Sequence, residues 1–214
     1  MNRLRVRFRR GSEVKYISHL DIIRVWVRAF RRAGIEPAYS EGFNPHPRIS
    51  LAAPLATGVT SDAELMDVYI NDSVSPHNFT AAVNRQMPAG MEILNTYQVD
   101  SGLPSLQAQV TAAEYSVQVA VEVGENSIRQ ALTDMLSKNQ IPWQHVRDTG
   151  IKSYDLRALI EDLWLESCSE NVAIVGMRLA CDNRGSGRPE QVIKALGFER
   201  PLSVHRTRLI LKTS

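Results

Sequence analysis

Hydrophobic and polar positions alternate at the start of the chain. Leu4, Val6 and Phe8 are separated by single polar residues, a period of two that predicts a half-buried strand. The separating positions are all arginine: Arg3, Arg5, Arg7 and Arg9. The pattern therefore predicts a first strand whose exposed face is made only of arginine.

The spacing of apolar residues then becomes helical. Ser18, followed three residues later by Asp21, is typical of a helix N-cap. The predicted apolar stripe of this helix is Leu20, Ile23, Val27 and Phe30. Gly34 is the kind of residue that ends a helix, because glycine readily adopts the left-handed conformation of a C-cap.

The rest of the first half continues with strands and a second helix. Residues 37–54 are rich in glycine, asparagine and proline and predict a loop with short extended pieces. Strands are predicted at 65–70 and 91–99, on either side of a helix that begins at Ser75-Pro76. Residues 100–111 break both periodicities and predict a linker.

The second half repeats this plan. It predicts, in order, a strand at 115–123, a helix at 127–138, two strands of a hairpin at 156–166 and 172–181, a helix at 189–196 and a strand at 204–212. Each half approximates the element order βαββαβ. We therefore predict an α+β fold of two tandem ferredoxin-like halves with antiparallel sheets, residues 1–104 and residues 105–214.

Composition narrows the class of protein. The 214 residues include 25 Lys and Arg against 23 Asp and Glu, for a formal charge of +2, and 43% are hydrophobic. This is the composition of a globular protein, and it excludes disordered, collagen-like and disulfide-rich miniature classes. No stretch approaches the roughly 18 apolar residues of a membrane span, and no apolar signal core follows the basic start. We expect a cytoplasmic protein.

The charge is unevenly distributed along the chain. Residues 1–48 hold 11 basic and 4 acidic residues (+7), residues 49–183 hold 7 and 17 (−10), and residues 184–214 hold 7 and 2 (+5). If the two basic ends meet in the fold, they form one positive face suited to a phosphate-bearing partner. The alternative interpretation is that these charge blocks are simply solvated.

The most unusual segment is residues 38–50. Two prolines bracket His46 and fix the backbone on either side of it, while Gly42 permits an approach that a larger residue would block. Such a rigid loop can present Asn44, His46 and Arg48 to a phosphate or a base edge. The alternative is a proline-stiffened surface connection without a ligand.

Arginine at helical spacing provides a second candidate surface. Arg24, Arg28 and Arg32 lie at positions i, i+4 and i+8 of the first predicted helix, and the guanidinium fork matches phosphate geometry. A solvated stripe is the alternative, because any amphipathic helix needs a polar outer face. The full set of predicted RNA- or phosphate-binding residues is Arg5, Arg7, Arg24, Arg28, Arg32, Asn44, His46, Arg48, Arg184, Arg188 and Arg206.

The spacing of cysteine and histidine argues against a metal centre. The two cysteines, Cys168 and Cys181, lie 13 residues apart, and the five histidines show no metal-ligand spacing. No nucleophile elbow or dinucleotide-binding glycine motif is present. We therefore predict no metal and no cofactor. His19 and His46 are the candidates for catalysis, and we expect His19 to be the neighbour of the loop that carries His46.

Three segments of the first half together resemble a known bacterial family. They are Tyr16-Ile17-Ser18-His19-Leu20-Asp21, Arg31-Arg32-Ala33-Gly34 and Tyr39-Ser40-Glu41-Gly42-Phe43-Asn44-Pro45-His46-Pro47-Arg48-Ile49-Ser50. On these residues the chain resembles the radical SAM-associated (radical SAM-linked) proteins of unknown function. That family occurs as separate chains or as a C-terminal extension of B12-binding radical SAM proteins. The resemblance therefore implies a radical SAM protein as partner.

Charge, fold class and resemblance together predict an accessory protein that binds RNA for a B12-binding radical SAM enzyme. Because this chain lacks the cysteines of an iron-sulfur cluster, the radical chemistry would take place on the partner. RNA as the ligand rests on fold analogy and charge. Two alternatives stay open: a metal-independent RNA-processing enzyme with His19 or His46 as acid or base, and a protein-only adaptor.

Overall fold

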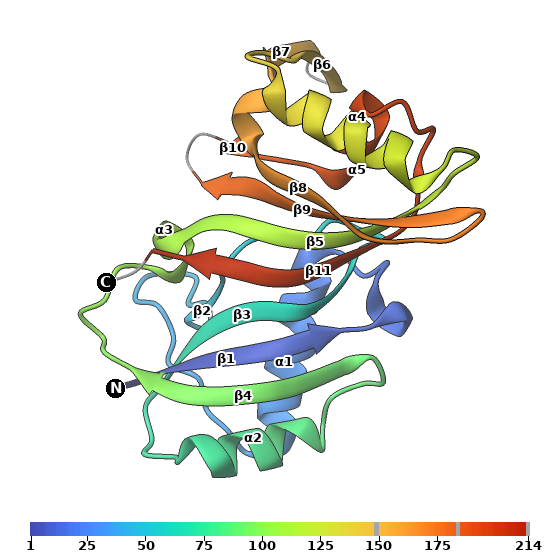
Figure 1. Ribbon diagram of the computed structural model, residues 1–214. Coiled ribbons are helices and arrows are strands. Elements are labelled where there is room, and N and C mark those ends of the chain that lie inside the picture. Colours follow the sequence, from blue (N-terminus) through green and yellow to red (C-terminus); the bar gives the residue numbers. More distant parts are fainter. Residues whose placement is uncertain (148–149, 183–184, 213–214) are drawn as a thin grey trace. The chain divides into compact units, whose positions relative to one another are not determined.

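The computed structural model describes residues 1–147, 150–182 and 185–212 (Figure 1). These residues form two compact units, residues 1–110 with Lys212 and residues 111–211. The predicted boundary after residue 104 falls earlier than this division. Residues 105–110 group with the first unit because Gln107 accepts a hydrogen bond from Ser50, and Gln109 accepts one from Arg5.

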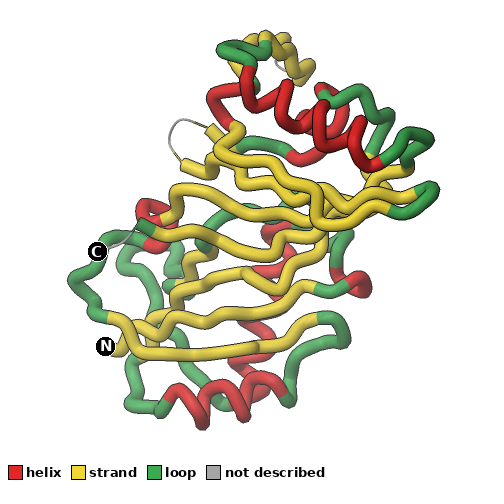
Figure 2. Tube along the Cα trace, in the orientation of Figure 1, coloured by secondary structure: helices red, strands yellow, loops and turns green. Residues whose placement is uncertain are grey.

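The first unit is a four-stranded sheet with two helices against one face. Its elements are β1 (Asn2–Arg10), the short helix η1 (Ser12–Val14), α1 (His19–Ala33), β2 (Ile49–Leu51), β3 (Thr60–Ile70), α2 (Pro76–Asn84), β4 (Met91–Val99) and α3 (Leu106–Gln109). The strands lie in the order β2-β3-β1-β4, each antiparallel to its neighbours. Figure 2 shows α1 behind these strands.

The ends of α1 are set by the residues that the sequence indicated. The Ser18 hydroxyl accepts a hydrogen bond from the Asp21 backbone N–H, and Gly34 closes the helix with a φ of 69°. The second helix begins in the same way, with the Ser75 hydroxyl accepting from the Asn78 N–H. These local signals confirm both predicted starts.

The buried face of α1 differs from the predicted stripe. Ile22, Trp26, Ala29 and Phe30 are buried, whereas the side chain of Leu20 is 65% exposed. Trp26 contacts Phe8 of β1 edge to face, with ring centroids 4.9 Å apart, so it lies at the centre of the core. The predicted stripe was wrong at Leu20 because the bulky Trp26 determines which side of the helix faces the sheet.

The other face of this sheet carries the arginines of β1, and part of it is covered. Arg3 and Arg5 are 2% and 4% exposed, so the prediction of a wholly exposed arginine face is wrong. Both guanidinium groups bond to the buried carboxylate of Asp67 on β3, at 2.6 Å and 2.8 Å. Arg3 also donates to the carbonyl groups of Leu103 and Pro104. The segment that the sequence indicated as a linker is therefore bound to the sheet.

The second unit combines a sheet with two helices and a separate hairpin. Its elements are β5 (Val110–Ala120), α4 (Glu125–Ser137), β6 (Pro142–Arg147), β7 (Gly150–Asp155), the short helix η2 (Arg157–Leu159), β8 (Ile160–Cys168), β9 (Val172–Asp182), β10 (Gly185–Ser186), α5 (Pro189–Ala195) and β11 (Pro201–Leu211). Strands β8 and β9 form the predicted hairpin. The order within the sheet is β8-β9-β5-β11.

Strands β6 and β7 were not predicted. Within residues 1–147, 150–182 and 185–212 they pair only with each other, antiparallel from Pro142 and Asp155 to Arg147 and Gly150. The chain is an α+β protein with mainly antiparallel strands, as the sequence predicted. None of the helices in the described part of the chain is long and apolar enough to cross a membrane.

Candidate nucleic-acid interface

The proline-rich loop of the first unit is fixed against the end of β3. The Ala38 N–H donates to the Tyr69 carbonyl at 2.7 Å, and the Tyr69 N–H donates to the Arg48 carbonyl at 3.1 Å. The Arg48 N–H closes the loop on the Ala38 carbonyl at 2.7 Å. The two ends of the loop therefore extend the edge of the sheet beyond β2, and residues 39–47 project from it.

Within the projecting part, Ser40 and His46 form a second closure. The Ser40 N–H donates to the His46 carbonyl at 2.8 Å, and the His46 N–H donates to the Ser40 hydroxyl at 3.0 Å. Gly42 has a φ of 121°, while the position of an added Cβ there is open. Gly42 is thus needed for its backbone conformation, and the expected close approach is absent.

The exposed tip of this loop is aromatic. Phe43 is fully exposed and Tyr39 is 53% exposed. Asn44 and His46 are also exposed, beside Phe43 in sequence. Burying a phenylalanine side chain stabilises a folded protein by about 1.5–3 kcal/mol relative to leaving it in water. Because Phe43 stays exposed, it does not contribute this stabilisation to the fold.

Arg48 lies at the base of the loop and is held in place by an aromatic ring. Its guanidinium carbon is 4.1 Å from the centroid of the Tyr69 ring, and Arg3 approaches the same ring at 5.7 Å. A guanidinium stacked on a ring keeps its charge and its outward N–H donors. Of the three predicted loop residues, Arg48 is thus fixed by side-chain packing, whereas Asn44 and His46 are presented at the tip.

The last turn of α1 adds positive charge at the same end of the unit. Arg31 and Arg32 are exposed, and only three residues separate Gly34 from Ala38, where the loop joins Tyr69. Arg24 forms an ion pair with Asp21 at 2.8 Å. Among the described residues no carboxylate forms an ion pair with Arg28, Arg31 or Arg32. Like charges at helical spacing repel each other, so these arginines do not stabilise the helix.

His19 lies at the opposite end of the unit. The Arg10 guanidinium donates to the Ile17 carbonyl, next to the start of α1, and Arg10 pairs with Ser61 at the start of β3. The loop bonds to Tyr69, eight residues further along β3, which corresponds to roughly 26 Å at about 3.3 Å per residue. The structure therefore places His19 and His46 apart, contrary to the expectation that they are neighbours.

The remaining predicted arginines have different surroundings. Arg7 is exposed and donates to the Asp62 carbonyl at 3.2 Å. Arg5 and Arg206 are 4% and 1% exposed, so their predicted place on an open surface is wrong. Burial lowers the pKa of Arg5, but the hydrogen bonds and charge of Asp67 outweigh burial and raise that pKa above its usual value. Arg188 is exposed in the second unit, and Arg184 lies outside the described residues.

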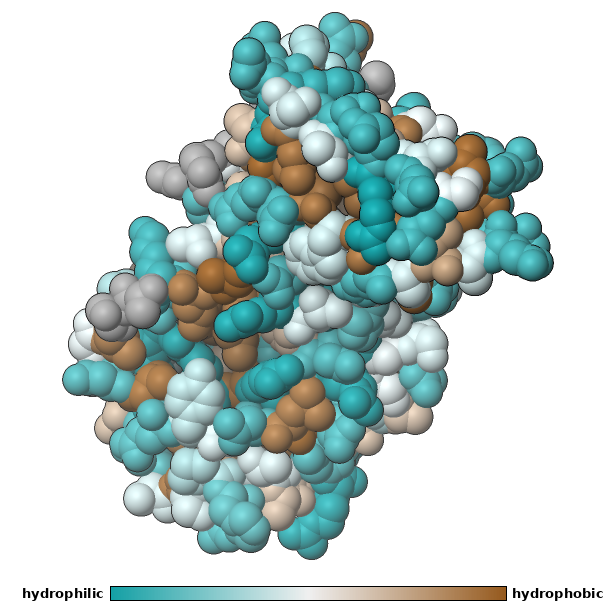
Figure 3. Space-filling model, in the orientation of Figure 1, coloured by the Kyte–Doolittle hydropathy of each residue, from teal (hydrophilic) through white to brown (hydrophobic). Residues whose placement is uncertain are grey.

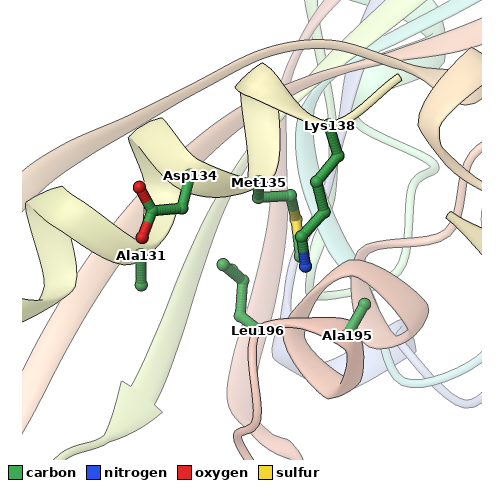
Figure 4. A pocket seen from close by; sticks show the side chains of 6 residues that line it. All are labelled: Ala131, Asp134, Met135, Lys138, Ala195 and Leu196. Carbon is green, nitrogen blue, oxygen red and sulfur yellow. The ribbon is translucent and has the colours of Figure 1, made fainter. Parts of the chain in front are cut away.

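The second unit contains a small pocket between α4 and α5 (Figure 4). It is lined by Ala131, Asp134, Met135, Lys138, Ala195 and Leu196. Its volume of about 200 Å³ is below the roughly 300–1,000 Å³ of typical ligand pockets, and it holds none of the predicted binding residues.

Figure 3 shows a mainly hydrophilic surface with separate hydrophobic areas on both units. In the described part of the chain no group of three His, Cys, Asp or Glu side chains is placed to hold a metal ion.

The loop surface combines two kinds of group that bind single-stranded nucleic acid. Exposed rings stack on bases, and guanidinium groups bind phosphates. Sequence reasoning identified the arginines but missed Phe43, Tyr39 and Tyr69. The signal was present in the sequence, because two of these rings lie within the proline-rich segment; only the structure shows that their faces are open.

The fold and this surface define an α+β protein with a cationic, aromatic loop at one end of its first unit. The chain belongs to the family described as "Uncharacterized protein conserved in bacteria (DUF2344)", which matches residues 3–189. A search of curated proteins finds no match to the chain.

Solved structures of low sequence identity are also similar. A chain of the Cbf5-Nop10-Gar1 complex aligns with a TM-score of 0.53 at 10% identity, over 96% of this chain and 48% of that chain. A chain of the archaeal box H/ACA sRNP Nop10-Cbf5 complex aligns with a TM-score of 0.49 at 11% identity, over 96% and 47%. This protein thus spans about half the length of those chains, and the first of these likenesses shows a shared fold.

Proposed function

We propose that this protein is an RNA-binding accessory protein and that the loop of residues 39–48 is its principal contact. Phe43 and Tyr39 stack on bases, while Arg48 binds a phosphate and Arg31 and Arg32 supply positive charge beside the loop. The observation that carries the proposal is the fully exposed Phe43 on a loop closed by hydrogen bonds above the stacked Arg48.

We also propose that each unit is a ferredoxin-like half. In the first unit the strand order is β2-β3-β1-β4, and in the second it is β8-β9-β5-β11. In both, the first strand of the unit lies between its third and fourth strands, as a split βαβ arrangement requires. The hairpin β6–β7 is then an insertion between the first helix and the second sheet strand of the second half.

A B12-binding radical SAM protein is the proposed partner. This part of the proposal rests on the sequence resemblance, carried mainly by residues 16–21, 31–34 and 39–50. The accessory chain would hold the RNA while the partner carries out the radical chemistry. The protein's own role needs no catalytic residue.

The alternative of a histidine-based RNA-processing enzyme is less well supported. Acid-base catalysis needs groups within hydrogen-bond reach of the same reacting atoms. His19 and His46 lie at opposite ends of β3, so they do not form one site. A single histidine at the loop tip has no side-chain hydrogen-bond partner among the described residues to orient it.

Filter binding at several salt concentrations tests the proposal. The probes are a labelled oligouridylate of about 16 nucleotides, the upper range of single-strand sites, and a hairpin RNA. We expect a plot of the logarithm of the oligouridylate binding constant against the logarithm of the salt concentration to be a falling line. Its slope should be about −0.7 for each phosphate that the protein contacts. Product length is checked on a gel, because cleavage would favour the enzyme. An absence of binding at low salt would contradict the proposal and favour the protein-only adaptor.

His46→Ala and Arg48→Ala separate binding from folding at the loop. The His46 side chain is exposed, so its loss should leave the melting temperature nearly unchanged while weakening RNA binding. Arg48→Ala should weaken binding more, with a small loss of stability from the Tyr69 contact, about 0.5–1 kcal/mol. A large fall in melting temperature with intact RNA binding would mean that the loop is a structural connection.

A further inference from the structure

The hairpin β6–β7 of the second unit is firmly attached at its base. The Asp155 carboxylate accepts hydrogen bonds from the backbone N–H groups of Ile141 at 2.8 Å and Arg157 at 2.9 Å. The Leu156 N–H donates to the Ile141 carbonyl at 2.8 Å. The hairpin is therefore a fixed feature of this unit. The Asp155 carboxylate accepts hydrogen bonds from the backbone on both sides of the hairpin.

One face of the hairpin meets the segment that begins α5. Trp143 pairs with Tyr154, and His145 follows two residues after Trp143, so these three side chains share a face. The Tyr154 hydroxyl donates to the Gln191 side-chain oxygen, and a His145 ring nitrogen lies 3.5 Å from an Arg188 guanidinium nitrogen. These two contacts, from positions two residues apart on the hairpin, thus bring Arg188 and the start of α5 beside it.

Arg188 brings a positive charge to this contact. Arg188 is exposed, and among the described residues no carboxylate forms an ion pair with it. An arginine beside an imidazole offers N–H donors that phosphate oxygens accept.

We propose that the hairpin β6–β7 and Arg188 form a second RNA-binding surface, separate from the loop of the first unit. Arg188 and His145 bind phosphate oxygens of the strand, and the half-buried rings of Trp143 and Tyr154 lie on the same face of the hairpin as His145. The inference rests on the proposed function, because it assigns the same class of ligand to a second place. It adds that each unit contributes its own contact to RNA.

The test compares Arg188→Gln with Arg200→Gln in the full-length protein. Arg200 is an exposed arginine of the same unit, in the turn before β11, so both variants remove one positive charge. Filter binding of the oligouridylate across a salt series measures affinity and salt slope. We expect Arg188→Gln to bind several-fold more weakly with a slope smaller by about 0.7, and Arg200→Gln to bind like the wild type.

Three results would overturn the inference. Equal affinity and slope for the two variants and the wild type would show that Arg188 does not contact the RNA, while the loop proposal stands. An equal loss in both variants would show that only net charge matters. Failure of the wild-type protein to bind the oligouridylate at low salt would overturn the proposed function and this inference together. Circular dichroism spectra of the variants check that both fold.

Discussion

At the scale of single residues, the most consequential group in the first unit is the Asp67 carboxylate. It is 1% exposed and bonds to two buried guanidinium groups, those of Arg3 and Arg5. Local alternation correctly places these arginines opposite the hydrophobic core. It does not show what covers them, because Asp67 and residues 100–109 lie 60 or more residues away in the sequence. Burial of these charges was therefore not predictable from the pattern.

Asp67→Ala should strongly destabilise the protein. Removing one partner of a buried ion pair typically costs about 3–5 kcal/mol, because the remaining charge is left buried and unpaired. Urea denaturation measures the free energy of unfolding. Glu125→Gln is the control, since it removes an exposed pair with Arg129 that is worth about 0.3–0.5 kcal/mol. A loss below about 1 kcal/mol in Asp67→Ala would contradict the role assigned to this carboxylate.

Asp21 should make α1 sensitive to acid. The hydrogen bond from the Ser18 hydroxyl, followed by that from Arg24, holds the pKa of this carboxyl below its ordinary value of 3.8. Because the pKa of Asp21 is lower in the folded state than in the unfolded state, its ionised form stabilises the folded protein above about pH 3.8. This stabilisation is lost as the pH falls through the folded-state pKa. Wild type should therefore lose more stability in acid than Asp21→Asn, as measured by urea unfolding at several pH values. Parallel pH profiles would contradict this assignment.

At the scale of elements, predictability followed local chemistry. Helices α1 and α2 begin where Ser18 and Ser75 predicted, because caps act within one turn. Strands β6 and β7 were missed, because basic residues and few apolar ones occupy that segment and its stability comes from Asp155 and contacts to α5. The loop was recognised from its prolines, but the open faces of Phe43 and Tyr39 depend on neighbours that the sequence does not place.

The hairpin β8–β9 offers a test of element packing. Gly176 on β9 faces Trp164 on β8, and a Cβ there would lie 2.0 Å from the Trp164 side chain. Gly176→Ala should cost about 1–3 kcal/mol by overpacking. Combining it with Trp164→Leu should remove much of that cost, since the clash partner is gone. A double-mutant cycle in urea measures the coupling, and strictly additive effects would show that Trp164 is not the obstacle.

At the scale of the whole molecule, the net charge of +2 says little about ligand binding. The first 48 residues are strongly basic, yet Arg3, Arg5 and Arg10 are buried and serve the fold. The arginines that we assign to the ligand are fewer and more local: Arg48 at the loop, Arg31 and Arg32 at the end of α1, and Arg188 beside the hairpin. The predicted meeting of the two basic ends on one face stays a prediction.

The most direct test of RNA binding by the loop compares Phe43→Ala with Tyr16→Ala. Both remove an exposed aromatic ring from the first unit, at 106% and 73% exposure, and Tyr16 lies near the start of α1, away from the loop. Filter binding with the oligouridylate is measured beside thermal melting. Loss of one stacked base corresponds to about 1–3 kcal/mol, or a roughly 5- to 150-fold weaker Kd. We predict this loss for Phe43→Ala alone, with melting temperatures unchanged. Equal RNA affinity for the two variants would contradict the proposed interface.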